Sequence, residues 1–249
     1  CNSFGNKSRT VVHYASKLNP ESWEVVFSTL ESFDLEELDE IGRTPLHLAA
    51  KRGCLPMVQW LLHRTENMKP DENGDTPLHL AASRRNKEAG EITKLLLAKG
   101  CSSAVLNNKG QTPLHIAAKS DCIGAAQELI RSYATLDRAN KKLLLPVHMA
   151  AKHGSLAVLK LLLSKGYNPK MEGPNKRNAL HLAAFAQSVE CVEALLQYHI
   201  SDVNKQDGNG CTPLILACMT KTSSSSSSSS AGGGEETTNV VEEREGEGE

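Results

Sequence analysis

The heptapeptide Thr-Pro-Leu-His-Leu-Ala-Ala occupies residues 44–50 and again residues 76–82, and Thr-Pro-Leu-His-Ile-Ala-Ala occupies residues 112–118. From one copy of the motif to the next, its third position advances by 34, 32, 36, 33, 33 and 34 residues. A period this regular predicts an array of similar structural units that stack side by side. The shorter copies are TVVH at Thr10–His13, LPVH at Leu145–His148, NALH at Asn178–His181 and TPLI at Thr212–Ile215.

Each unit is predicted to contain two helices. Thr44 is a favourable N-cap because its hydroxyl can accept hydrogen bonds from the backbone N–H groups of the first turn. Pro45 suits the first helical position, since no amide donor is lost there. The alanines that end the motif allow a neighbouring helix to approach closely. Further along, apolar residues at spacings of three and four, such as Val58, Leu61 and Leu62, predict a second helix with one buried stripe.

The repeated motif resembles that of the ankyrin-repeat family, which has a period of about 33 residues and the signature Thr-Pro-Leu-His-x-Ala. The resemblance covers residues 8–222 and implies an all-α solenoid of helix–turn–helix units joined by β-hairpin-like loops. Turn-forming stretches such as Asp71–Gly74 and Asn107–Gly110 would form these projecting loops. The expected units are residues 1–40 (a degenerate N-terminal capping repeat), 41–73, 74–108 (with an insertion), 109–141, 142–175, 176–208 and 209–222 (a partial repeat), followed by a disordered poly-Ser and acidic tail at 223–249.

Two units depart from the motif. The 36-residue step contains an apparent three-residue insertion within residues 83–91, which we expect in the turn between the two helices of that unit. In the fifth unit Leu145 replaces the capping Thr, which weakens the cap by about 1 kcal/mol, and Leu143 replaces the turn Gly. The apolar run 143–145 is interpreted either as a packing adjustment or as a contact surface.

Composition excludes several classes of function. The chain has 28 basic and 29 acidic residues, but residues 231–249 alone hold seven Glu and one Arg, so the rest carries a net charge of about +5. This weak basicity, together with an aromatic content of 4%, does not fit a dedicated nucleic-acid binder. No apolar run reaches the ~18 residues of a membrane helix, so we expect no direct membrane insertion in this segment.

Seven cysteines without CxxC spacing favour free thiols in a reducing compartment. The expected location is therefore cytoplasmic, with the nucleus or the cytoplasmic side of a membrane as alternatives. We predict no enzyme, because the GxSxG, HExxH, Walker-type and GxGxxG motifs are absent from the sequence. A catalytic thiol would also need a lowered pKa, and no sequence neighbour indicates one. No cofactor is expected.

One His in each unit raises the alternative of a metal ladder. Stacked helices lie about 8–10 Å apart, whereas zinc-bound imidazole nitrogens lie within ~2.1 Å of the metal. We therefore expect no metal site, and predict instead that each His bonds the hydroxyl of the capping Thr and a backbone group of the next unit. The residues given this structural role are Thr44, Pro45, His47, Thr76, Pro77, His79, Thr112, Pro113, His115, His148 and His181.

The function is expected on the surface. In the ankyrin family, partners usually contact the hairpin tips and the exposed side of the first helices, so the resemblance implies a partner protein at these positions. The early tips lean acidic and the later ones basic, which indicates a partner of the opposite polarity. The candidate tip residues are Glu40, Ile41, Arg43, Glu72, Asn73, Asp75, Asn108, Lys109, Gln111, Lys141, Lys142, Lys176 and Arg177.

Basic residues also follow the first helices, and would form a positive stripe if the units stack in register. The stripe could recognise an acidic peptide or headgroup; alternatively, these cations only complement the helix dipole. The acidic tail could itself lie on the stripe as an internal competitor. The stripe residues are Lys51, Arg52, Arg84, Arg85, Lys87, Lys119, Lys152 and His153.

A further resemblance concerns a modification site. Leu196, followed six residues later by Asp202, Val203 and Asn204, is similar to the pattern that asparaginyl hydroxylase modifies in ankyrin repeats. Asn204 is therefore a candidate for hydroxylation; alternatively, it simply closes a turn.

Three hypotheses for the whole protein stay open. The first is a non-catalytic scaffold or adaptor that binds a partner protein through the hairpin tips and the concave face. The second is the cytoplasmic N-terminal ankyrin array of a cation channel of the transient receptor potential type. The third is the regulatory region of a larger ankyrin-containing enzyme. Because the sequence lacks an initiating Met and its last unit stops after one helix, we expect a fragment of a longer chain.

Overall fold

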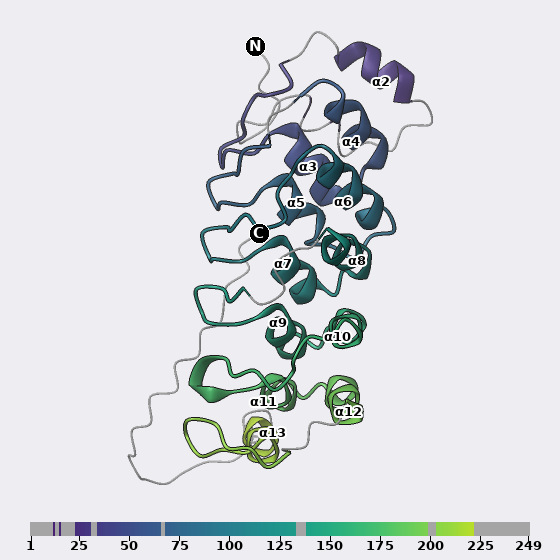
Figure 1. The fold of residues 1–249 in the computed structure, drawn as a ribbon. Coiled ribbons are helices and arrows are strands. Elements are labelled where there is room, and N and C mark those ends of the chain that lie inside the picture. The colour runs from purple at the N-terminus through teal and green to yellow at the C-terminus, as the bar shows by residue number, and fades with distance from the viewer. Residues whose placement is uncertain are drawn as a thin grey trace, which may run out of the picture.

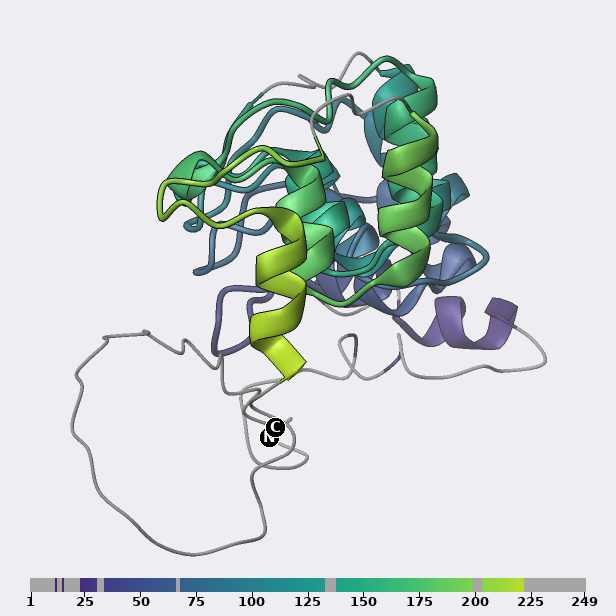
Figure 2. The ribbon, with the colours of Figure 1, turned by 90° about the horizontal axis from the view of Figure 1, so that it is seen from below.

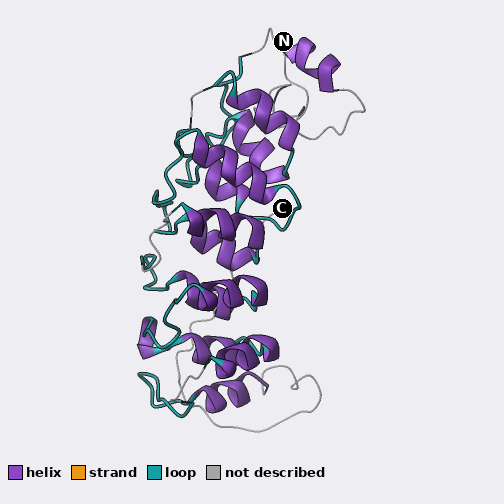
Figure 3. Ribbon diagram, turned by 45° about the vertical axis from the view of Figure 1, so that its right-hand side comes forward, coloured by secondary structure: helices purple, strands orange, loops and turns teal. Residues whose placement is uncertain are grey.

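The computed structural model describes residues 12, 15, 23–30, 34–65, 68–132, 138–198 and 203–221. Within these ranges every regular element is a helix, as Figure 3 shows. The predicted tail at 223–249 and much of the expected unit 1–40 lie outside the described residues. The elements are α2 (Trp23–Leu30), α3 (Pro45–Arg52), α4 (Leu55–Leu62), α5 (Pro77–Ala81), α6 (Ala89–Ala98), α7 (Pro113–Ser120), α8 (Ile123–Arg131), α9 (Pro146–Lys152), α10 (Leu156–Ser164), the 3-10 helix η1 (Pro174–Lys176), α11 (Ala179–Phe185), α12 (Val189–Gln197) and α13 (Pro213–Lys221).

From α3 onward the helices form two parallel rows (Figure 1). The inner row contains α3, α5, α7, α9, α11 and α13, and each of these helices contacts the next. The outer row contains α4, α6, α8, α10 and α12, which likewise contact one another in order. Seen along the stack in Figure 2, the hairpin loops project from the side of the inner row that faces away from the outer row. This arrangement confirms the predicted all-α solenoid.

The core lies between the two rows. The motif leucines Leu46, Leu78 and Leu114 are fully buried, and the stripe residue Leu61 of the outer row is buried with them. Burying each such side chain contributes roughly 1.5–3 kcal/mol. Alanines such as Ala49 are also fully buried and let adjacent inner helices approach. Because one helix pair is too small to bury its own apolar face, stability comes from stacking neighbouring pairs.

The N-terminal helix α2 packs against the first outer helix. Leu30 is buried, and the ring of Phe27 stacks on that of Trp60 with centroids 5.0 Å apart. These contacts cover the part of α4 that has no preceding outer helix.

The two departures from the motif have clear structural outcomes. The insertion lies between α5 and α6, where a seven-residue connection replaces the two-residue turn of the neighbouring pairs, as predicted. In the run 143–145 the packing interpretation applies to two residues, and the contact-surface interpretation stays a prediction for the third. Leu144 and Leu145 are buried, whereas Leu143 is 65% exposed and has a φ of +58°. Within the described residues, no helix is both long and apolar enough to cross a membrane.

Candidate functional site

All hairpins in the described part of the chain except the fifth, which opens on Gly173, are built on one buried Asp or Asn side chain. In the second hairpin, the backbone N–H of Asp71 donates to the carbonyl of Asp75 at 2.9 Å. The Asp71 carboxylate accepts from the N–H groups of Asn73 and Asp75, both at 2.9 Å. This arrangement holds the loop without a regular strand pair. The same bonds recur at Asp39, Asn107, Asn140 and Asp207.

Successive hairpin tips are joined by backbone hydrogen bonds. Asn108 donates to the carbonyl of Asn73 at 2.9 Å, and Lys141 donates to that of Lys109 at 3.2 Å. Gly74 permits this close approach, because its φ is +75° and a Cβ there would lie 2.8 Å from the backbone nitrogen of Asn108. The tips therefore form a continuous ladder along much of one edge of the stack.

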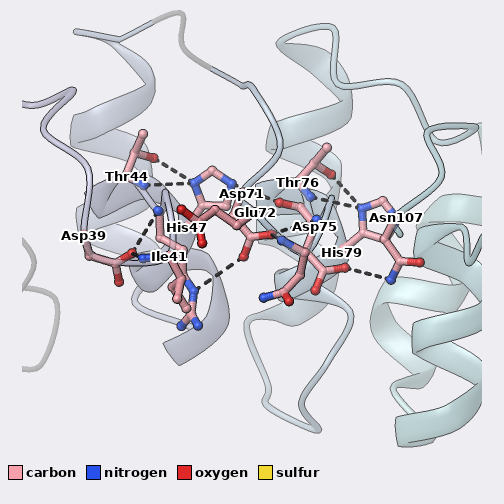
Figure 4. A network of polar contacts seen from close by, with 12 residues as sticks. Asp39, Ile41, Thr44, His47, Asp71, Glu72, Asp75, Thr76, His79 and Asn107 are labelled. Carbon is pink, nitrogen blue, oxygen red and sulfur yellow. Dashed lines mark hydrogen bonds and ion pairs between the residues drawn. The ribbon is translucent and has the colours of Figure 1, made fainter. Parts of the chain in front are cut away.

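The motif histidines connect the hairpins to the inner helices (Figure 4). The backbone N–H of Thr44 donates to Nδ1 of His47 at 3.2 Å, and the Thr44 hydroxyl lies 2.9 Å from the same nitrogen. On the other side of the ring, Nε2 lies 3.2 Å from the carbonyl oxygen of Asp75 in the next unit. These are the two kinds of contact expected of His47 from the sequence, and His79 and His115 make the same pair of contacts.

These contacts define the protonation state of the histidines. Because the backbone N–H of Thr44 can only donate, Nδ1 of His47 must accept, and the ring proton lies on Nε2. A second proton on Nδ1 would break this bond inside a buried site. Burial accordingly lowers the pKa of His47 and of His115 to about 4. Each ring is thus neutral near pH 7, with both nitrogens engaged in the scaffold.

The structure divides the candidate tip residues by exposure. Gln111 is buried, and its carbonyl accepts from His79, so it belongs to the scaffold. Ile41 is half-buried, and its carbonyl accepts from the N–H of Glu72. The tip residues that are exposed to solvent are Glu40, Glu72, Asn73, Asn108, Lys109, Lys141, Lys142 and Lys176.

Three other candidate tip residues bridge adjacent hairpins, which sequence analysis missed. Nε of Arg177 lies 2.9 Å from the carboxylate of Asp207, whose side chain is fully buried. Arg43 pairs with Asp71 in the same way at 3.5 Å. The carboxylate of Asp75 accepts from the side chain of Asn107 at 2.9 Å. The sequence signal was present in these three units, since a charged residue directly precedes the cap and an Asp or Asn opens the next hairpin.

One stripe residue also has a structural role. Arg85 donates from Nε to the carbonyl of Ser120 at 3.0 Å and lies 3.2 Å from the Asp121 carboxylate. That carboxylate also accepts from the N–H of Val158 at 2.9 Å. Arg85 and Asp121 therefore link three successive units. The other predicted stripe residues Arg52, Arg84, Lys87, Lys119, Lys152 and His153 are exposed, and Lys51 is half-buried.

A continuous hollow runs between the hairpins and the inner helices. Its two parts have volumes of about 620 and 580 Å³ and share Lys109, Gln111 and Lys119. Among the described residues that line it, the one acid is Asp75, which bonds Asn107. We call this hollow the basic groove; its basic lining residues are Lys51, Arg84, Lys109, Lys119, Lys141, Lys142, Lys152 and His153.

The charge of the groove affects its own residues. Burial, followed by the nearby guanidinium groups of Arg43 and Arg84, lowers the pKa of Lys51 below its usual value. Burial is the larger cause, and the two guanidinium groups add to it because a lysine near other cations is harder to protonate. The arrangement can attract an anionic ligand.

The C-terminal end of the stack has a different character. A hollow of about 600 Å³ lies between α12 and α13 and is lined mainly by apolar residues, among them Val189, Leu196 and Leu214. Asn204, the candidate for hydroxylation, is exposed in the adjoining turn, next to Val203 at the edge of this hollow. Exposure is compatible with both expectations for Asn204, so its hydroxylation stays a prediction.

Four of the thiols are buried or half-buried in ways that disfavour the thiolate. Burial raises the pKa of Cys101 to about 11, and it also raises the pKa values of Cys54, Cys122 and Cys191. A raised pKa reduces the thiolate fraction, which is the nucleophilic form. Within the described part of the chain, no three His, Cys, Asp or Glu side chains are grouped as metal ligands would be.

Comparison with known families gives two matches. A model of ankyrin repeats in three copies matches residues 64–140 and 147–225. A second model, of ankyrin repeats in many copies, matches residues 30–81.

Individual relatives share only parts of their length with this chain. It is 36% identical over 78 residues to the human transient receptor potential cation channel subfamily A member 1, which covers 31% of this chain and 7% of the channel. It is 31% identical over 124 residues to alpha-latrotoxin-Lg1a of Latrodectus geometricus, or 49% of this chain and 9% of the toxin. It is 32% identical over 116 residues to the putative E3 ubiquitin-protein ligase XBAT31 of Arabidopsis thaliana, or 42% of this chain and 25% of the ligase. The chain therefore spans less than a tenth of the first two proteins.

Proposed function

The chain belongs to the ankyrin-repeat family, and from this premise we propose that it is a non-catalytic scaffold that binds a partner protein through its hairpin tips and concave face. Ankyrin repeats imply protein–protein interaction. The proposal goes further, because it assigns the binding surface to the basic groove and the exposed tips beside it. A cytoplasmic location is part of the same proposal.

The observation that carries this proposal is the composition of the basic groove. Lys109, Lys141 and Lys142 come from hairpin tips, whereas Lys119 and Lys152 come from inner helices, yet all of them line one hollow. Lysine side chains keep their ammonium groups in water while their stems cover apolar surface. A cluster of this kind suits an acidic segment of a partner and accelerates its association at low salt.

The charge of the exposed tips changes from acidic to basic along the stack. The exposed acids Glu40 and Glu72 lie on the first two tips, while Lys109, Lys141 and Lys142 lie on the third and fourth. A partner with a basic end and an acidic end would therefore bind in one direction only. Such charge complementarity contributes to specificity and register more than to raw affinity.

The test is a charge reversal confined to the groove. We compare the intact chain with a variant carrying Lys141→Glu, Lys142→Glu and Lys152→Glu in affinity purification from cell extracts. Arg177, although a candidate tip residue, is left unchanged because it pairs with Asp207. A matched control carries Lys99→Glu, Lys160→Glu and Lys165→Glu, at exposed positions outside the groove.

We expect a defined set of proteins to bind the intact chain and the control but not the groove variant. Those proteins are expected to contain acidic segments, and their binding should weaken with salt. Recovery of the same proteins by all three chains would contradict the proposal. Circular dichroism of each variant establishes that the helices are intact.

The two wider hypotheses stand beside this one. The similarity to the human channel subunit favours an ankyrin array on the cytoplasmic side of a membrane, and the similarity to the plant ligase favours the regulatory region of an enzyme. In both cases the stack of ankyrin repeats would still act by binding a partner protein. A full-length transcript separates the hypotheses, because it encodes membrane spans, a catalytic domain or neither.

A further inference from the structure

We propose that the acidic segment 235–249 of the same chain occupies the basic groove when no partner is bound. This inference rests on the proposed function, since it uses the same groove, and it adds a regulatory element to it. A partner would then have to displace the segment, so the segment lowers the apparent affinity of the chain for that partner.

The first support is charge complementarity. Segment 235–249 contains seven Glu and a single Arg, Arg244, giving a net charge of −6. The groove presents Lys109, Lys119, Lys141, Lys142 and Lys152. One exposed ion pair contributes at most about 1 kcal/mol, so a stable contact needs several pairs at once. The acidic segment supplies several carboxylates, and the groove supplies several ammonium groups to pair with them.

The second support is reach. The last inner helix, α13, ends at Lys221, and the 13 residues 222–234 separate it from the acidic segment. Fully extended, 13 residues span about 43 Å. A Ser- and Gly-rich chain of this length has a root-mean-square span of roughly 20 Å.

The C-terminal end of the groove lies within that span. Lys152 ends α9, which is two inner helices away from α13, and neighbouring packed helices are about 8–10 Å apart. The separation along the stack is therefore about 16–20 Å. A tether whose natural span matches the distance between two sites gives effective concentrations in the millimolar range. Even if the acidic segment binds weakly, it would then occupy the groove in most molecules.

The third support is the composition of the groove lining. The lining acid, Asp75, already bonds Asn107, and the part shared by the hairpin tips and α9 contains no acid among its described residues. An acidic segment would therefore meet cations over most of the groove and little repulsion. Its glutamates present the same chemistry as the acidic partner segment proposed above, so the two would compete.

The experiment uses the full chain and a fluorescent peptide with the sequence of residues 235–249, added in trans at about 25 mM salt, where screening is weak. Binding is measured by fluorescence anisotropy for the intact chain and for a variant with all seven glutamates of 235–249 replaced by Gln. We expect the neutral-tail variant to bind the peptide about fivefold or more tightly, because its groove has no internal competitor. Addition of 0.5 M salt should abolish the difference.

Two further variants locate the site. Adding Lys141→Gln, Lys142→Gln and Lys152→Gln to the neutral-tail chain should remove peptide binding, whereas Lys99→Gln, Lys160→Gln and Lys165→Gln should not. Carbodiimide cross-linking of the intact chain provides a second measurement. It is expected to join glutamates of 235–249 to groove lysines and not to those three control lysines.

The outcomes separate the two proposals. If the neutral-tail variant binds the peptide in the groove with the affinity of the intact chain, and no groove cross-links form, the tail inference is wrong and the proposed function stands. If the groove variant of the neutral-tail chain binds the peptide as well as its parent, the groove is not an acidic-segment site and the proposed function fails. Cross-links spread equally over groove and control lysines would also overturn the inference.

Discussion

The second and fifth hairpins of the stack have the same closure but different side chains. In the second, the N–H of Asp71 donates to the carbonyl of Asp75 at 2.9 Å; in the fifth, that of Gly173 donates to Arg177 at 2.8 Å. The Asp71 carboxylate holds two further backbone N–H groups, whereas Gly173 has no side chain to do so. The difference teaches that the closing backbone bond does not require an Asp or Asn side chain at the opening position of the hairpin.

The motif histidine beside the fifth hairpin lies close to Gly173. His79 reaches the carbonyl of Gln111, one residue before the next cap, whereas His148 reaches that of Met171, seven residues before it. A Cβ on Gly173 would lie 3.0 Å from Nδ1 of His148. Gly173 therefore makes room for the ring. The contact from the cap N–H to Nδ1 stays at 3.2 Å in both units.

Acidification is expected to have the largest effect. In the folded chain His47 and His115 stay neutral until pH falls to about 4, whereas in the unfolded chain they protonate near 6.5. Between these values the unfolded state binds more protons, so stability is full above about pH 6.5 and is lost as pH falls. At pH 5 each of these histidines should therefore lower the free energy of unfolding by on the order of 2 kcal/mol relative to pH 8.

Urea unfolding at pH 8 and pH 5 measures this loss, and His115→Gln should make it smaller. His148, whose pKa burial also lowers, provides the comparison with the irregular region. A free energy of unfolding that is equal or larger at pH 5 would show that the rings are not held neutral.

Exchanging the residues that open two hairpins tests their difference directly. Gly173→Asp introduces the residue that opens several of the other hairpins. We nevertheless expect it to lower the free energy of unfolding by about 2 kcal/mol, because its Cβ would press on the ring of His148. The reciprocal change Asn140→Gly should cost a similar amount, since two backbone N–H groups lose their acceptor. Urea unfolding checks both; a gain in stability from Gly173→Asp would mean that hairpin position alone determines the best residue.

The smallest predicted effect is a gain. Leu143 has a φ of +58°, a conformation that costs a non-glycine residue about 1 kcal/mol, and its side chain is mostly exposed. Leu143→Gly should therefore raise the free energy of unfolding by about 1 kcal/mol. Leu144→Gly is the control and should lower it strongly, because Leu144 is buried. A loss with Leu143→Gly would reveal that the exposed Leu side chain stabilises the hairpin.

The sequence predicted the helices and the contact between a motif histidine and its capping Thr because both depend on local patterns. Thr44 and His47, for example, are three residues apart and meet within one turn. It did not predict the pairs Arg43–Asp71 or Arg177–Asp207, whose partners are about one repeat apart and meet only after the units stack in register.

The candidate site was predicted in part. The sequence suggested separate basic tips and a basic stripe, but not that Lys109 and Lys152 line the same groove. That convergence depends on how far the hairpins fold over the inner helices, which spacing along the chain does not define. The use of Arg85 in the scaffold was missed for the same reason.

The most direct test of the central claim is a backbone amide NMR titration of the neutral-tail chain with the acidic peptide. We predict chemical-shift changes that disappear in the Lys141→Gln, Lys142→Gln, Lys152→Gln variant. They should cluster at the groove-lining residues Lys109, Gln111, Lys119, Ser120, Lys141, Lys142, Leu144, Met149, Lys152 and His153. Changes centred on the outer helices α8, α10 and α12, or no changes at low salt, would contradict the claim that the groove is the binding surface.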